Sequence, residues 1–211
     1  MDKTNVQYGC GLSAPENWVN FDASPTLRIQ RIPILGKVLK NKLNTIFPSN
    51  VIYGDIVKGL PLKENSCDNI YCSHTLEHLS FSDCLQALKN TILVLKKAGI
   101  FRCIVPDLEM YARDYVSKVE NKDSDAGNNF VKKLLMGKEN RKRGFINLME
   151  SQFGNSHHLW MWDKYSLKTQ LEKVGFTEVR LCVFNDSKEP AFKDVEHPGR
   201  FIESIAFECI K

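Results

Sequence analysis

Apolar and polar residues follow one another in a pattern that predicts short strands separated by helices. An amphipathic helix is clearest between Ser82, its expected N-cap, and Lys97, where a Lys-Lys pair suits the negative C-terminal end. The apolar stripe of this helix comprises Leu85, Leu88, Ile92 and Leu95. Further helical patterns cover residues 28–47, 108–119 and 167–174, and the last of these stops at Gly175.

Seven β-rich runs alternate with these helices. They lie at residues 6–8, 18–21, 51–53, 69–72, 100–105, 179–184 and 202–210. Alternation of strands and helices favours a mostly parallel sheet with helices on both faces. The sequence therefore predicts a doubly wound α/β fold.

The composition fits one globular domain. The 211 residues are 43% hydrophobic and 26% charged, which is enough apolar material for one core. We predict a single domain over residues 1–211, with a basic helical insertion at about 121–158. The net charge of +4 permits an anionic substrate but does not require nucleic acid.

The seven cysteines show no CxxC spacing, and their number is odd. We interpret them as reduced core thiols of a cytoplasmic protein. The N-terminal residues lack the apolar stretch of a signal peptide, and no apolar run is long enough to span a bilayer. The pattern indicates nothing about oligomeric state.

Glycines and carboxylates follow the first two predicted strands, where doubly wound sheets bind their ligands. Gly9-Cys10-Gly11 would let the backbone approach a ligand closely. Asp22 could accept hydrogen bonds from both hydroxyls of a ribose. Alone, the glycines could form an ordinary turn and Asp22 could cap a helix that starts near Ser24. Together they favour ribose binding.

The third strand ends in Tyr53-Gly54-Asp55-Ile56. The Asp55 carboxylate could accept a proton from an exocyclic amine such as that of adenine, and Ile56 could cover the ring face. A simple turn aspartate is the alternative.

The segment Ser66–Leu79, which ends in Ser73-His74-Thr75-Leu76-Glu77-His78-Leu79, is the most specific in the chain. It resembles class I S-adenosylmethionine-dependent methyltransferases, especially small ones encoded among bacterial polysaccharide genes, whose fourth strand ends in Ser-His-x-Leu-Glu-His-Leu. Other runs resemble that family in the same order along the chain. They are Tyr8–Gly11, Trp18–Ser24, Tyr53–Ile56, Leu93–Gly99 and Leu167–Phe176.

The resemblance implies a Rossmann-like sheet of seven strands, mostly parallel with an antiparallel last strand. It implies S-adenosylmethionine as cofactor, with S-adenosylhomocysteine as product. The cofactor-binding residues that it implies are Gly9, Cys10 and Gly11 under the methionine part, Asp22 and Ala23 at the ribose, Asp55 and Ile56 at the adenine, and Ser73 and His74 beside the sulfonium. The short gap from Gly11 to Asp22 departs from the family, because it leaves at most a turn where the first helix should begin. A helix N-terminus is thereby lost from the carboxylate side of the site.

Glu77 and His78 are the first candidates for catalysis, because they follow the fourth strand near the expected methyl group. Histidine is a suitable base near neutral pH. The alternative is that both residues only brace the next helix. His157, in an aromatic run that ends at Asp163, is a second candidate base, although this run could equally be an aromatic plug on the sheet edge.

We predict no metal site. The i, i+3, i+4 spacing of His74, Glu77 and His78 would nevertheless place three ligand types on one face of a helical turn. A divalent metal with a further ligand from His157 or His158 therefore stays open as an alternative.

The resulting hypothesis is a methyltransferase that acts on an oxygen or nitrogen of a small molecule or glycan, which could be anionic. Two alternatives are a nucleic-acid methyltransferase that uses the basic insertion, and a non-catalytic module that binds the cofactor. Nucleic acid is the weaker partner, because no Asn-Pro-Pro-Tyr-like base-methylation motif is present.

Overall fold

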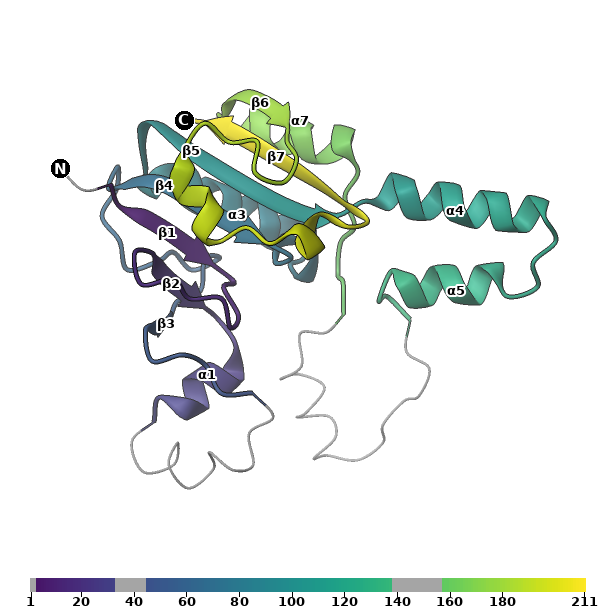
Figure 1. Cartoon of the computed structure of the whole chain (residues 1–211), viewed down its shortest axis with the longest axis horizontal. Coiled ribbons are helices and arrows are strands. Elements are labelled where there is room, and N and C mark those ends of the chain that lie inside the picture. Colours follow the sequence, from purple (N-terminus) through teal and green to yellow (C-terminus); the bar gives the residue numbers. More distant parts are fainter. Residues whose placement is uncertain (1–2, 33–44, 138–156) are drawn as a thin grey trace.

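The computed structural model describes residues 3–32, 45–137 and 157–211. Within them, seven strands form one sheet in the order β3-β2-β1-β4-β5-β7-β6 (Figure 1). The strands are β1 Asn5–Tyr8, β2 Val19–Asp22, β3 Val51–Tyr53, β4 Cys67–Ser73, β5 Leu95–Pro106, β6 Thr177–Leu181 and β7 Ser204–Ile210. All neighbours are parallel except β7, which is antiparallel to both β5 and β6. The predicted Rossmann-like sheet is confirmed.

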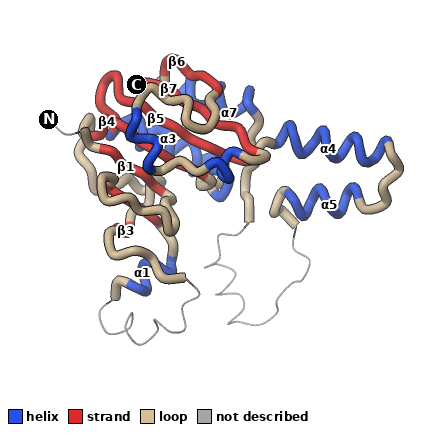
Figure 2. The backbone as a smooth tube through the Cα atoms, in the orientation of Figure 1, coloured by secondary structure: helices blue, strands red, loops and turns tan. Residues whose placement is uncertain are grey.

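Two helices cover one face of the sheet, α3 (Phe81–Val94) and α7 (Lys164–Val174) (Figure 2). Their apolar residues pack with alternate residues of the central strands in the largest core cluster. The helix α7 starts with a capping box at Asp163 and ends at Gly175, whose φ of +114° gives the left-handed stop that the sequence predicts.

The start and end of α3 differ from the sequence prediction. Its N-cap is Ser80, whose hydroxyl accepts a hydrogen bond from the Asp83 amide at 3.2 Å, so Ser82 lies inside the first turn. The helix ends at Val94, and Lys96 already belongs to β5. Pairing of Leu95 with Cys67 of β4 pulls the backbone out of the helix earlier than the apolar period indicates.

The opposite face of the sheet carries α1 (Pro25–Gln30) and, further along, the segment 183–203 with its two short 3-10 helices, η3 (Pro190–Asp194) and η4 (Pro198–Phe201). Only a turn joins β1 to β2, so no helix covers the strands there. Instead, Phe192 and Val195 pack on Trp18 and Tyr71.

A polar row crosses this same face, as the strand registers show. It comprises Asn20, Gln7, Tyr71, Arg102, Glu208 and Arg180. Gln7 donates to the Asn20 side chain at 2.6 Å and to the Ser13 carbonyl at 2.7 Å, which satisfies its buried amide.

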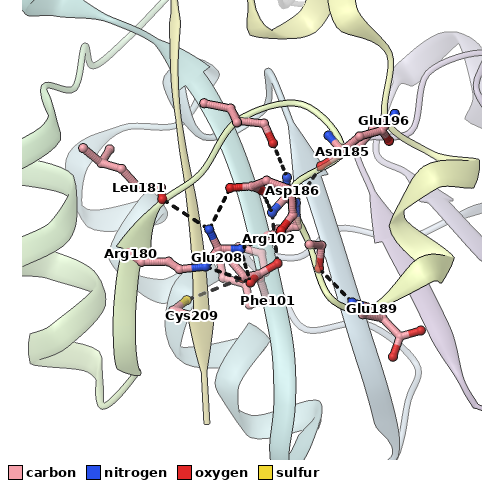
Figure 3. Close-up of polar contacts among 12 residues, drawn as sticks. Phe101, Arg102, Arg180, Leu181, Asn185, Asp186, Glu189, Glu196, Glu208 and Cys209 are labelled. Atoms are coloured by element: carbon pink, nitrogen blue, oxygen red, sulfur yellow. Dashed lines mark hydrogen bonds and ion pairs between the residues drawn. The ribbon is translucent and has the colours of Figure 1, made fainter.

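Arg102 is the charged centre of that row and is only 1% exposed. Its guanidinium donates to Glu196 at 2.6 Å, to Asp186 and Glu208 at 2.9 Å each, and to the Val183 carbonyl at 2.9 Å (Figure 3). Three of these partners belong to the segment 183–203, and the Glu196 side chain is fully buried. The network therefore fixes this segment on the sheet.

The helices α4 (Leu108–Glu120) and α5 (Ala126–Lys133) form an arm that projects from the end of β5 (Figure 1). They are joined by stacked rings of Tyr115 and Phe130 with centroids 4.9 Å apart. The helix α5 falls within the predicted insertion, but half of that insertion (residues 138–156) and much of the predicted helix at 28–47 lie outside the described residues. A 3-10 turn, η2 (Leu76–His78), follows β4.

All seven cysteines are buried and free, as the sequence predicts. Among the described residues, none of the helices combines the length and apolarity needed to cross a bilayer.

Removing the positive charge at Arg102 tests the role of the network. We expect Arg102→Met to lower the free energy of unfolding by about 3–5 kcal/mol, because it leaves the buried Glu196 carboxylate unpaired. Arg180→Met is the matched control, since Arg180 contacts Asp186 and Glu208 from an exposed position and should cost no more than about 1 kcal/mol. Urea unfolding measures both. Equal losses in the two variants would contradict this account of the network.

Candidate active site

A cavity of about 190 Å³ lies beside the carboxyl ends of β1, β2, β3 and β4. The predicted site residues that line it are Gly9, Asp22, Ala23, Asp55, Ile56, His74 and His78. The topology explains their meeting, because parallel strands present their carboxyl ends at one edge of the sheet. Residues separated by up to 69 positions in sequence are thus brought to one cleft.

Asp22 holds the glycine turn in place. Its carboxylate accepts hydrogen bonds from the Gly11 amide at 2.9 Å and the Ser24 amide at 2.7 Å. A carboxylate has about four lone-pair positions, so two remain for a ligand. Asp22 therefore serves both as a structural acceptor and as a wall of the cavity.

Asp55 is also partly engaged by its own turn. One oxygen accepts from the Val57 amide at 3.0 Å, and the other lies 3.4 Å from the Lys58 ammonium. Asp55 therefore stabilises its own turn and also lines the cavity. Ile56, 5% exposed, supplies an apolar wall beside it.

Gly9 and Gly11 both have left-handed backbone angles, with φ of +64° and +56°. They differ in their surroundings. A Cβ on Gly9 would lie 2.0 Å from the Thr75 hydroxyl oxygen, whereas a Cβ on Gly11 would have nothing within 4 Å. Gly9 permits a close approach between β1 and the turn after β4, and Gly11 borders open space.

A second cavity of about 340 Å³ shares Tyr8 and Gly9 with the first. Cys10 and Ser73 line it, as do Tyr71, His197 and Arg200, which the sequence analysis did not select. The hydroxyls of Tyr71 and Ser73 are buried without a hydrogen-bond partner among the described residues. Burial raises the pKa of Tyr71, which keeps its hydroxyl protonated and able to donate. No carboxylate lines this cavity in the part of the chain that the structure describes.

Glu77 lies behind the first cavity and is 1% exposed. Its Oε1 is 3.3 Å from Nδ1 of His74 and 4.0 Å from Nε2 of His78. Neither Glu77 oxygen has a hydrogen-bond partner among the described residues. A buried carboxylate without hydrogen bonds is costly, so its environment must supply positive charge.

His157 and His158 take different positions. His157 points Nδ1 at the Leu135 carbonyl, 3.0 Å away, and lines neither of the two cavities. His158 is buried with its ring centroid 5.1 Å from that of His78. Burial lowers the pKa of His158, so its ring is neutral at neutral pH. Of these two histidines, His158 is the one whose ring joins the Glu77 cluster.

The sequence matches a known family over this part of the fold. Residues 6–103, just under half of the chain, fit a protein-family model described as a methyltransferase domain. The matched region runs from β1 into β5 and includes Gly9, Asp22, Asp55 and Glu77. Over residues 6–103 the chain is therefore similar to the methyltransferase domain family. Enzymes with this domain take their methyl group from S-adenosylmethionine, which is therefore the cofactor that the domain implies.

Solved structures share the fold of this chain at low sequence identity. An S-adenosylmethionine-dependent methyltransferase from Thermotoga maritima is 17% identical with a TM-score of 0.50, and the match covers 100% of this chain and 83% of that chain. A methyltransferase in complex with the Trm112 methyltransferase activator from Haloferax volcanii is 14% identical with a TM-score of 0.50, covering 99% and 82%.

A third structure is phosphoethanolamine N-methyltransferase 2 of Haemonchus contortus, in complex with phosphomonomethylethanolamine and S-adenosylhomocysteine. It is 10% identical with a TM-score of 0.50, and the match covers 100% of this chain and 49% of that chain. At these identities the likeness shows the fold alone. The comparison with curated proteins found no match.

Gly9 and Gly11 give a matched test of the turn that follows β1. We expect Gly9→Ala to lower the free energy of unfolding by more than about 2 kcal/mol, because it adds the clash with Thr75 to the left-handed backbone cost. Gly11→Ala should cost about 1–2 kcal/mol, the backbone term alone. Chemical unfolding of both variants decides the point. A Gly11→Ala loss as large as that of Gly9→Ala would show that the contact with Thr75 is unimportant.

Proposed function

We propose that this chain transfers a methyl group from S-adenosylmethionine to an oxygen or nitrogen of a small molecule or glycan. The observation that carries the proposal is the cavity that joins Gly9, Asp22, Asp55 and His78. The bound cofactor supplies a methyl group on a sulfonium, which is a good leaving group. The protein must bind that cofactor, align the acceptor and accept the acceptor's proton where one is lost.

The residues of the smaller cavity suit an adenosine. Asp22 retains free lone pairs after its two backbone bonds, and these can accept from the two ribose hydroxyls. Asp55 and Ile56 offer an acceptor and an apolar wall for the adenine. Ala23 lies next to Asp22 on the same cavity wall. The cavity thus offers acceptors for the ribose hydroxyls and the adenine amine, and an apolar surface for the adenine ring.

The larger cavity suits the amino-acid part of the cofactor. It begins at Gly9, and the polar side chains that line it are those of Gln7, Tyr8, Ser13, Tyr71, Ser73, His197 and Arg200, with no carboxylate among the described residues. The Arg200 guanidinium makes no ion pair with a described residue. This cation would take the place of the helix N-terminus that the short turn from β1 to β2 cannot provide.

Glu77 and His78 are the proposed proton-accepting group. His78 lines the smaller cavity, and Glu77 lies behind it with an unbonded carboxylate. The Nδ1 atom of His78 lies 3.0 Å from the His157 carbonyl, which fixes its ring and leaves Nε2 facing Glu77. His157 thus contributes to this pair through its backbone, and a direct role as a base stays a separate proposal.

An anionic group on the acceptor is compatible with the net positive charge of the chain. A glycan acceptor follows from the resemblance of the Ser73–Leu79 run to methyltransferases of polysaccharide gene clusters. Cytoplasmic location belongs to the same proposal.

Cofactor binding is tested by a thermal shift. At a 100-fold excess over Kd, S-adenosylmethionine or S-adenosylhomocysteine should raise the melting temperature by about 5–10 °C, and NAD should not. Asp22→Asn should weaken binding at least about tenfold, because it removes charge and an acceptor from the ribose site. Asp83→Asn, an exposed aspartate on α3, is the matched control and should bind normally. Stabilisation by NAD alone, or an unchanged shift in Asp22→Asn, would refute the assignment.

The role of Arg200 is tested with a truncated ligand. Arg200→Gln should weaken S-adenosylhomocysteine binding about tenfold, and it should leave 5′-methylthioadenosine binding unchanged, because that nucleoside lacks the amino-acid part. Lys193→Gln, an exposed cation of the same segment that lines neither cavity, is the control. Isothermal titration calorimetry gives both affinities. If Arg200→Gln binds S-adenosylhomocysteine as tightly as the unaltered chain, the guanidinium does not bind the cofactor carboxylate.

A further inference from the structure

The side chains of Glu77, His78 and His158 each offer a ligand atom, and these atoms all lie within 4.8 Å of one another. Glu77 and His158 are buried, and His78 is partly exposed toward the smaller cavity. Clusters of exposed carboxylates are common without a metal. This one differs, because its carboxylate is buried and has no hydrogen bond from a described residue.

The orientation of the rings is the second observation. His78 places Nδ1 3.0 Å from the His157 carbonyl, and His74 places Nε2 2.9 Å from the Arg200 carbonyl. A carbonyl can only accept, so each of these nitrogens carries the proton. In the neutral ring the other nitrogen then carries a lone pair, and in both rings that nitrogen faces Glu77. A histidine that donates to a carbonyl from one nitrogen and binds through the other is the usual arrangement at metal sites.

His158 adds an independent sign. Its Nδ1 is buried and has no hydrogen-bond partner among the described residues. Three unsatisfied buried atoms, two from Glu77 and one from His158, therefore gather in one place. Unpaired polar atoms of this kind are rare in folded proteins, and a missing ion is one of the few explanations for several together.

From this arrangement we propose that Glu77, His78 and His158 bind a divalent zinc ion beside the smaller cavity. Two imidazoles and one carboxylate form a set typical of catalytic zinc sites, which keep a further position for water or substrate. Magnesium is disfavoured, because it prefers a shell of oxygen ligands. His74 borders the cluster, with its Nδ1 3.3 Å from Oε1 of Glu77.

The site needs only small movements to close around an ion. Ligand atoms of tetrahedral zinc are about 3.3 Å apart for bonds of about 2.0 Å. The present separations of up to 4.8 Å therefore require side-chain shifts on the order of 1 Å. The backbone around the cluster is already held, since the Glu77 carbonyl accepts from the Leu159 amide at 2.7 Å.

The position of this ion suits it to activate the methyl acceptor, an inference that rests on the proposed function. His78 lines the cavity where the cofactor is proposed to bind, so an acceptor hydroxyl could occupy the open position. A zinc-bound oxygen acid has a lowered pKa, because the cation stabilises its deprotonated form. With the ion bound, Glu77 and His78 would act as its ligands and no longer accept the proton themselves, and the acceptor's proton would pass to water.

Zinc content of the full chain, prepared without a histidine tag, is the direct test. After incubation with equimolar zinc and dialysis, elemental analysis should find about one zinc per chain. Glu77→Gln and His158→Asn should each lower zinc affinity at least about 100-fold in a competition titration with a chromogenic chelator. His197→Asn is the matched control, since it alters a histidine outside the cluster and should keep full affinity.

Each result has one meaning. Absence of bound zinc in the unaltered chain overturns the proposal, as does unchanged zinc affinity in folded Glu77→Gln and His158→Asn. If either variant fails to fold, His78→Asn replaces it, and cobalt(II) absorption of the unaltered chain reports imidazole coordination directly. S-adenosylhomocysteine binding to zinc-free protein is measured alongside. Cofactor binding without zinc binding overturns the metal site alone, and zinc binding without cofactor binding overturns the proposed function.

Discussion

The buried ion pair between Arg102 and Glu196 is the constraint on which the site depends. It joins β5 to a segment 94 positions later, and neither side chain is exposed by more than 1%. Two ions that are both desolvated must stay paired, because separation would leave a charge in the core. The segment 183–203 is therefore held on the sheet at a defined place. Arg200 in turn brings its carbonyl to the His74 ring and lines the larger cavity.

The segment 183–203 covers the part of the sheet that a helix between β1 and β2 would normally cover. A helix between β1 and β2 would normally cover the sheet there and point its N-terminus at the ligand. The present chain covers that face with Phe192 and Val195, and the Gln7 amide donates to that of Asn20 while both donate to carbonyls of the connection between β1 and β2. In the proposed function, Arg200 supplies the positive charge. The proposed function thereby moves the electrostatic contribution of a helix terminus onto Arg200, which a single substitution can remove.

The sequence predicted the parts of the structure that depend on local pattern. All seven strands follow from short apolar runs bounded by turn residues, and the cavity residues follow from the rule that ligands bind at the carboxyl ends of such strands. Gly175 ends α7 as expected, because a left-handed stop is a local event. These features need no knowledge of distant contacts.

The rest depends on contacts between distant positions. The end of α3 is set by pairing between β4 and β5, and the side chain that joins the Glu77 cluster is that of His158, where the sequence favoured its neighbour as the base. Arg102 offered one usable signal, since a charged residue inside an apolar strand must find a buried partner. From the sequence one can predict that Arg102 has a buried partner, but not which residue that partner is. Arg200 carried no signal, because its role arises only after the loop is anchored.

A crystal structure of the chain with S-adenosylhomocysteine tests the central claim most directly. The account predicts both ribose hydroxyls within hydrogen-bond distance of the Asp22 carboxylate, the adenine beside Asp55 and Ile56, and the sulfur between Gly9 and His78. Electron density for the nucleoside at any other place, with the cleft between Asp22 and Asp55 empty, would contradict it.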